Sequence, residues 1–238
     1  MSDSSSQPRF IFPIGGGGFS HLLDQYALDL TQKARPKVCF LPTASGDAEG
    51  YIENFYASFG ALEAECSHLS LTRYNQADPV AHLLSQDMIY VGGGNAFQML
   101  LVWRAHGLDK ALLKAWERGT VLTGLSAGSL CWFSGATTDS WGLPLRVFND
   151  GLGLLPQSHS PHYDTEPERR EIYEKSIAQG DLPDGVAIDD HCGVLFKGTT
   201  LIESVCSVAG KVAYRVTREG GAAKTRAIPT RLLDSEPA

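Results

Sequence analysis

The fold is decided by the stretch Thr120-Val121-Leu122-Thr123-Gly124-Leu125-Ser126-Ala127-Gly128-Ser129-Leu130-Cys131-Trp132. Its first half is an apolar run typical of a buried strand, and small residues follow in a Gly-x-Ser-x-Gly pattern. Two glycines around a serine permit a sharp turn from a strand into a helix, which exposes the hydroxyl at the helix N-terminus. The stretch therefore predicts either a nucleophilic Ser126 or a close strand-helix contact that requires small residues.

Strands and helices alternate on the N-terminal side of this stretch. Apolar runs typical of strands, each followed by residues with helical spacing, occupy residues 9–14, 37–41, 65–71 and 88–91. This alternation predicts an α/β fold with a mostly parallel sheet that helices cover on both faces. The functional loops of such a sheet lie at the carboxyl ends of its strands.

Glycine-rich segments follow three of the predicted strands, at residues 15–18, 92–94 and 124–128. Because parallel strands end at the same edge of a sheet, we expect these segments to form one cleft. Read alone, the triple glycine at 92–94 also fits a loop that binds nucleotide phosphates. That interpretation is weak because the chain has no Gly-Lys-Ser/Thr and no Gly-x-Gly-x-x-Gly in a suitable context.

The pattern changes beyond Gly135, where prolines and glycines become frequent. Strands are predicted at residues 152–155, 186–188, 194–197 and 211–217, and a helix at 168–178. No linker, repeat or charge block separates this part from the rest. We therefore expect a disordered tail over residues 1–8 and a single domain over 9–233, with β-rich additions in its C-terminal third.

Composition excludes several classes of protein. The 238 residues carry a net charge of −7, which argues against nucleic acid as a partner. Since no apolar run approaches the ~18 to 20 residues that span a bilayer, we expect a cytoplasmic protein without a membrane partner. The five cysteines are an odd number without Cys-x-x-Cys spacing, which favours reduced thiols.

A serine nucleophile requires a base that accepts its proton. Three of the seven histidines, His159, His162 and His191, lie outside the regular segments, and His162 follows Pro161 in a loop that can direct its side chain into a cleft. These three do not follow the usual zinc spacings, so we expect no metal ion and no cofactor.

The base in turn requires a carboxylate, and the oxyanion requires two N–H donors. Asp139 lies soon after the predicted nucleophile helix, and Asp190 lies at the end of a predicted strand, so the sequence leaves both open. Ala127 supplies one N–H in this type of turn, and a glycine among residues 92–94 could supply the other.

Three motifs in chain order resemble those of the peptidase E family of serine peptidases, which includes aspartyl dipeptidase and cyanophycinase. They are Tyr90-Val91-Gly92-Gly93-Gly94-Asn95-Ala96-Phe97-Gln98, Gly124-Leu125-Ser126-Ala127-Gly128 and Pro161-His162-Tyr163. The resemblance implies a class I glutamine-amidotransferase-like, flavodoxin-like fold in which serine replaces the cysteine of that superfamily.

The resemblance also implies roles for individual residues. Ser126 is the expected nucleophile, His162 the general base, and the N–H groups of Gly94 and Ala127 the oxyanion hole. The family acid is a glutamate followed by glycine. Asp190 stands there in this chain, followed by His191, and Asp139 remains the alternative acid.

Substrate recognition departs from the family pattern. The arginine that pairs with an aspartyl substrate has its position at Glu168 here, so aspartyl preference does not carry over, and the candidate substrate-binding residues are Asn95, Arg169 and Arg170. The leading hypothesis is a serine peptidase that cleaves small peptides, in particular dipeptides, through an acyl-enzyme. The alternative is a non-catalytic amidotransferase-like module that binds a small molecule or nucleotide. The oligomeric state stays open, with a homodimer as the candidate assembly.

Overall fold

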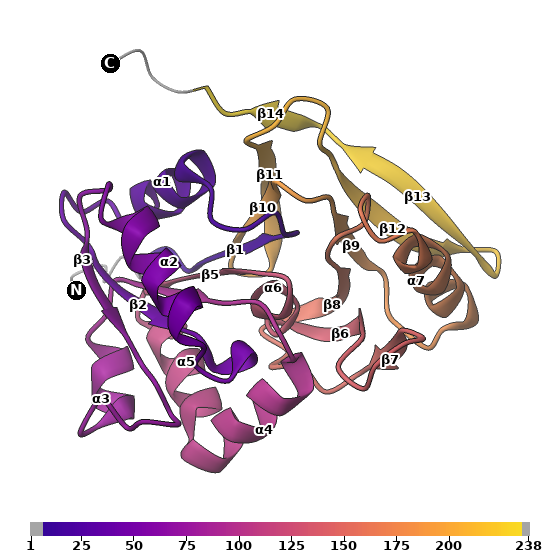
Figure 1. Ribbon diagram of the computed structural model, residues 1–238. Helices are drawn as coiled ribbons and strands as arrows, with labels where there is room; N and C mark the ends of the chain where they lie inside the picture. Colours follow the sequence, from indigo (N-terminus) through magenta and orange to yellow (C-terminus); the bar gives the residue numbers. More distant parts are fainter. Residues whose placement is uncertain (1–6, 235–238) are drawn as a thin grey trace, which may run out of the picture.

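The computed structural model describes residues 7–234, which form two β-sheets with surrounding helices (Figure 1). Most of the expected tail, residues 1–6, lies outside the described part. The larger sheet has eight strands in the order β14-β11-β10-β1-β5-β4-β2-β3. Their bounds are β1 Phe10–Ile14, β2 Lys37–Leu41, β3 Glu65–His68, β4 Met88–Val91, β5 Val121–Leu125, β10 Cys192–Lys197, β11 Thr200–Cys206 and β14 Thr230–Leu232.

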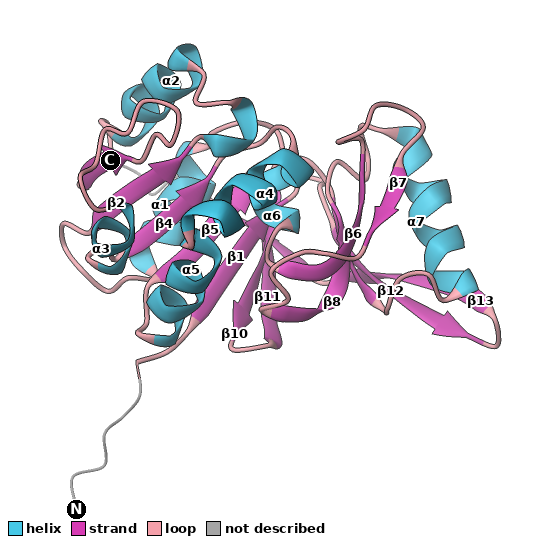
Figure 2. Cartoon of the chain, turned by 90° about the horizontal axis from the view of Figure 1, so that it is seen from below, coloured by secondary structure: helices cyan, strands magenta, loops and turns pink. Residues whose placement is uncertain are grey.

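Five neighbouring strands of the larger sheet, β3, β2, β4, β5 and β1, run parallel. The helices around them are α1 His21–Asp29, α2 Glu49–Phe59, α3 Pro79–Leu84, α4 Ala96–His106 and α5 Leu108–Glu117, and η1 is a short 3-10 helix at Thr43–Ser45. α1 and α2 cover one face, and α3, α4 and α5 the other (Figure 2).

Alternate residues of β2 explain this arrangement. Val38 and Phe40 belong to the buried cluster that includes α1 and α2, whereas Cys39 and Leu41 belong to the cluster that includes α3, α4 and α5. A strand that is apolar on both sides is buried on both faces, as parallel sheets require. The predicted α/β fold, with a mostly parallel sheet between two layers of helices, is confirmed.

Six of the strands that follow Ser126 form a second sheet in the order β13-β12-β9-β8-β6-β7, whereas β10, β11 and β14 extend the larger sheet. The members of the second sheet are β6 Phe133–Thr138, β7 Arg146–Phe148, β8 Leu155–Ser160, β9 Gly185–Ile188, β12 Ala213–Glu219 and β13 Ala222–Ile228, and helix α7, Pro167–Gln179, packs on it. One buried cluster includes side chains of both sheets, Leu122 and Phe133 among them, so the sheets share a core. Across residues 7–234, no helix combines the length and apolar character that a membrane crossing requires.

The chain crosses between the two sheets at positions that matter for function. It leaves the larger sheet after β5, at Ser126, and returns between β9 and β10, at Asp190. It leaves again between β11 and β12, near Lys211. The groups at these crossings therefore gather along the junction of the sheets.

Two predicted strands differ clearly from the observed ones, and the first of them, expected at residues 65–71, ends at His68 as β3. The strand expected at residues 152–155 starts only at Leu155 and runs to Ser160 as β8. Gly153 has a φ of +67°, and a Cβ at Gly151 would overlap the carbonyl oxygen of Phe133, so the residues before Leu155 form an irregular segment that packs against Phe133 instead. As a result, His162 lies directly beyond a strand end rather than in a long loop.

Candidate active site

Ser126 occupies a sharp turn between β5 and α6, Ala127–Leu130, with φ 56° and ψ −118°. A Cβ at Gly124 or at Gly128 would overlap the carbonyl oxygen of Val91 in the neighbouring strand β4. The two glycines are thus needed because the turn passes against β4, and the serine between them takes a backbone conformation that non-glycine residues rarely adopt. The turn is the strand-to-helix elbow that the sequence predicts.

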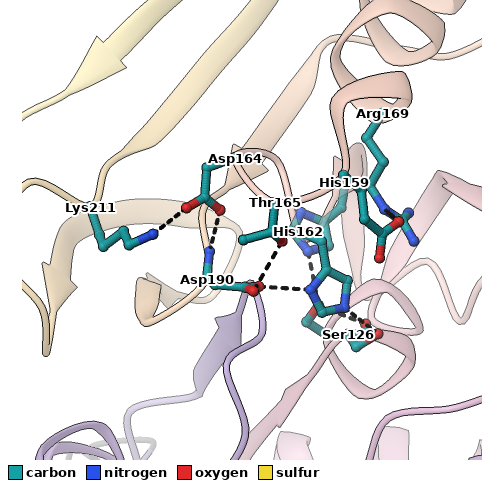
Figure 3. A network of polar contacts seen from close by, with 10 residues as sticks. Ser126, His159, His162, Asp164, Thr165, Arg169, Asp190 and Lys211 are labelled. Carbon is teal, nitrogen blue, oxygen red and sulfur yellow. Dashed lines mark hydrogen bonds and ion pairs between the residues drawn. The ribbon is translucent and has the colours of Figure 1, made fainter.

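The structure brings Ser126, His162 and Asp190 into one chain of hydrogen bonds (Figure 3). Ser126 Oγ lies 2.9 Å from His162 Nε2, and His162 Nδ1 lies 2.7 Å from Asp190 Oδ1. The side chains of His162 and Asp190 are 19% and 15% exposed, so the pair is largely shielded from solvent. His162 comes from the turn after β8, and Asp190 from the turn between β9 and β10.

Proton positions in this chain follow from the charge of Asp190. Burial opposes ionisation of the carboxylate, but hydrogen bonds from His162 and Thr165 hold the pKa of Asp190 below its ordinary value. An ionised carboxylate only accepts, so His162 Nδ1 carries the proton that it donates to Asp190. His162 Nε2 then has the free lone pair, and the Ser126 hydroxyl donates to it. This is the arrangement in which serine can be deprotonated.

Two segments near Ser126 contain backbone N–H groups that could bind a ligand oxygen. The nearest atoms to a Cβ built at Gly93 belong to Leu125 and Ser126, so the 92–94 segment contacts the elbow. Gly94 has a φ of +136°, and a side chain there would overlap the carbonyl oxygen of Ala44. Within residues 7–234, neither the Gly94 nor the Ala127 N–H donates a hydrogen bond to a protein group, so both are free for a ligand oxygen.

The buried side chain of His159 is hydrogen-bonded to the helix that follows the Ser126 turn. His159 Nδ1 donates to the carbonyl oxygen of Val186 at 2.9 Å, so His159 Nε2 is an acceptor. The hydroxyl of Ser129 has one proton and faces two acceptors, His159 Nε2 at 2.9 Å and the carbonyl oxygen of Ser126 at 2.8 Å. Burial lowers the pKa of His159 to about 3, so it is neutral at physiological pH. His159 therefore holds the turn in place and is unavailable as a second base or a metal ligand. Its buried place in β8 could not be inferred from a strand predicted to end at residue 155.

The alternative acid Asp139 does not reach the histidine. It is exposed at the end of β6, and its carboxylate makes no hydrogen bond to any residue in the described range. Of the two carboxylates that the sequence leaves open, the structure places Asp190 beside His162.

The three candidate substrate-binding residues have partners within the protein. Asn95 accepts from the N–H of Gln98, which caps α4, and donates to the carbonyl oxygen of Ser140 at 2.8 Å. It thus ties the loop after β6 to the glycine segment that carries Gly94. In this structure Asn95 has a positioning role, with both ends of its amide engaged.

Arg169 is buried, with its side chain 4% exposed, and bonds Glu166 Oε2 at 2.6 Å and the carbonyl oxygen of Thr137 at 3.1 Å. Arg170 instead lies with its guanidinium 4.8 Å from the ring centre of Tyr163. Both arginines fasten α7 to the second sheet.

Gly16 is a site residue whose role the sequence does not reveal. A Cβ there would overlap Asp190 Oδ1 and His162 Cε1, so the glycine provides the space in which the pair meets. We expect Gly16→Ala to displace the pair and to lower kcat/KM for peptide hydrolysis about 100-fold, the usual effect of misplacing a catalytic group by about 1 Å. Steady-state kinetics measure this. Gly50→Ala in α2, where a Cβ meets no atom within 4 Å, is the matched control, and equal activity of both variants would refute the prediction.

Comparisons with known proteins agree with one another. The sequence profile of peptidase family S51 matches residues 11–204. An uncharacterised peptidase of Bacillus subtilis, YgaJ, is 44% identical over 211 residues, which cover 87% of this chain and 91% of the relative. A peptidase E of Streptomyces coelicolor is 29% identical over 178 residues and 71% of each chain. The crystal structure of a peptidase from an acI-B1 actinobacterium superimposes with a TM-score of 0.71 at 16% identity, over 93% of this chain and 95% of that one.

Proposed function

The chain belongs to peptidase family S51, and from this membership we propose that it hydrolyses small peptides, dipeptides in particular, with Ser126 as the nucleophile. The observation that carries the proposal is the unbroken chain of hydrogen bonds from Ser126 through His162 to Asp190. Serine peptidases on unrelated folds use the same order of groups.

In the proposed acylation step, Ser126 Oγ attacks the substrate carbonyl carbon while its proton passes to His162 Nε2. The resulting imidazolium is stabilised by the carboxylate of Asp190, to which Nδ1–H remains bonded. The N–H groups of Gly94 and Ala127 donate hydrogen bonds that stabilise the negative charge on the carbonyl oxygen. Collapse of the tetrahedral intermediate breaks the C–N bond as His162 protonates the leaving amine, which leaves an ester on Ser126.

Deacylation repeats these steps with water. His162 Nε2 removes a proton from the water as its oxygen attacks the ester carbonyl, and the same two N–H groups hold the oxyanion. His162 then returns the proton to Ser126 Oγ, which releases the carboxylic acid product.

A fluorophosphonate probe tests the proposal directly, because it reacts with an activated serine and not with a merely exposed one. We expect one equivalent of label on Ser126, identified by peptide mass spectrometry, and release of the first residue from members of a dipeptide library. Arg169 and Arg170 have partners within the protein and therefore do not define the specificity for the first residue. Comparing hydrolysis of dipeptides with acidic, neutral and basic first residues measures that specificity. Absence of both labelling and hydrolysis would refute the proposal and would favour a binding module.

A further inference from the structure

The turn that follows His162 holds Asp190 at three points. His162 Nδ1 bonds Asp190 Oδ1 at 2.7 Å, and the hydroxyl of Thr165 donates to Asp190 Oδ2 at 3.0 Å. The backbone N–H of Asp190 donates to Asp164 Oδ1 at 2.9 Å. One short segment therefore contacts both carboxylate oxygens and the main chain of the same residue, as Figure 3 shows.

Asp164 is itself fixed from a third part of the chain. Its second oxygen, Oδ2, is paired with the ammonium group of Lys211, which lies where the chain crosses from β11 to β12. The side chains of Lys211 and Asp164 are 25% and 22% exposed, so solvent screens this pair only in part. The ion pair thus joins the turn after β8 to a crossing between the two sheets.

The backbone at Asp190 has reason to need such support. Aspartate has a short side chain with one methylene, so the position of its carboxylate depends closely on where its main chain lies. The following residue, His191, has a φ of +61°, a conformation that glycine adopts freely and that costs energy for a histidine. The turn at Asp190 and His191 must therefore be placed accurately for the carboxylate to reach His162, and its backbone conformation is strained.

We propose that Asp164, anchored by Lys211, and Thr165 are positioning residues for the triad acid, which compensate for a short Asp190 and a strained His191. The inference rests on the proposed role of the Ser126, His162 and Asp190 chain. Its consequence is that residues outside the Ser126, His162 and Asp190 chain affect the catalytic rate through the orientation of Asp190.

Four variants of the full-length protein test this. We expect Thr165→Val to lower kcat by about threefold to tenfold, and Asp164→Ala by about 30-fold to 100-fold, with KM changed by less than about twofold. Thr165→Ser, which keeps the hydroxyl, should stay within about twofold of the parent. Lys211→Met should also lower kcat, but by less than Asp164→Ala. If Asp164→Ala fails to fold, Lys211→Met and Thr165→Val together test the proposal.

Asp87→Ala is the matched structural control. Asp87 also pairs with a lysine, Lys33 at 2.6 Å, and accepts a backbone N–H, that of Lys37 at 2.9 Å, but on a distant part of the surface. Its removal should lower the unfolding midpoint without a change in kcat. If Asp164→Ala and Thr165→Val match the parent in kcat, or if Asp87→Ala loses as much kcat as Asp164→Ala, the inference is wrong.

A second measurement separates this inference from the proposed function. The proton between His162 Nδ1 and Asp190 should give a far-downfield NMR resonance that is absent from the Asp190→Asn protein. Thr165→Val and Asp164→Ala should shift or broaden it, whereas Asp87→Ala should not. If the parent shows no hydrolysis and no probe labelling, the function fails while this readout still decides whether Asp164 and Thr165 position Asp190.

Discussion

Replacing Ser126 with alanine is expected to lower kcat/KM for peptide hydrolysis by a factor of about 10⁴ to 10⁶ and to abolish fluorophosphonate labelling. The hydroxyl lies 2.9 Å from His162 Nε2, and its removal deletes the only nucleophile that the elbow presents to that nitrogen. The free N–H groups of Gly94 and Ala127 remain, so residual rate enhancement should come from oxyanion binding alone.

The same experiment includes two further variants and a control. His162→Ala should lose about as much activity as Ser126→Ala, and the double variant little more, because the two groups act as one unit. Ser134→Ala is the matched control, since this half-buried serine only donates to the carbonyl oxygen of Gln157 at 2.9 Å. Ser126→Ala with parental activity would show that hydrolysis uses another group.

The larger sheet could be predicted from the sequence because its signal is local. Runs such as Lys37–Leu41 and Met88–Val91 are buried on both faces, and the helices that follow them have one apolar side. Each strand and its following helix can therefore be recognised from a stretch of about 25 residues. The strands of the second sheet are harder to predict from the sequence. Polar residues of β8 such as His159 and Ser158 are fully buried there, where they make side-chain hydrogen bonds that no local pattern reveals.

Some residues of the candidate site could likewise be predicted from the sequence, whereas others could not. Ser126 and the glycine segments stand out because tight turns restrict which residues fit, and His162 stands out because it follows a proline. The acid could not be chosen from the sequence, because Asp139 and Asp190 both follow strands of the second sheet and only their position decides between them. Lys211 lies 47 residues from Asp164, so their ion pair becomes visible only when the crossings between the sheets are placed.

Asp190→Asn is expected to lower kcat by a factor of about 10³ to 10⁴ with little change in KM. The carboxamide has no charge to stabilise the imidazolium that forms when His162 accepts the Ser126 proton. It can also turn its NH₂ toward His162 Nδ1, which would move the histidine proton to Nε2 and remove the lone pair that Ser126 needs. Since the pKa of Asp190 is held below its ordinary value, the parent retains the charge throughout the neutral range and the variant lacks it there.

Asp139→Asn is the control that makes this comparison decisive. Asp139 is exposed and makes no side-chain hydrogen bond within the described residues, so its amide should keep parental kcat and KM. Both substitutions replace one carboxylate oxygen by NH₂ and remove one negative charge, so a general effect of charge on the protein would appear in both. A loss confined to Asp190→Asn would identify the contact with His162 as its cause. A larger loss in Asp139→Asn would instead mean that the acid acts from the loop after β6, and that the chain must rearrange before catalysis.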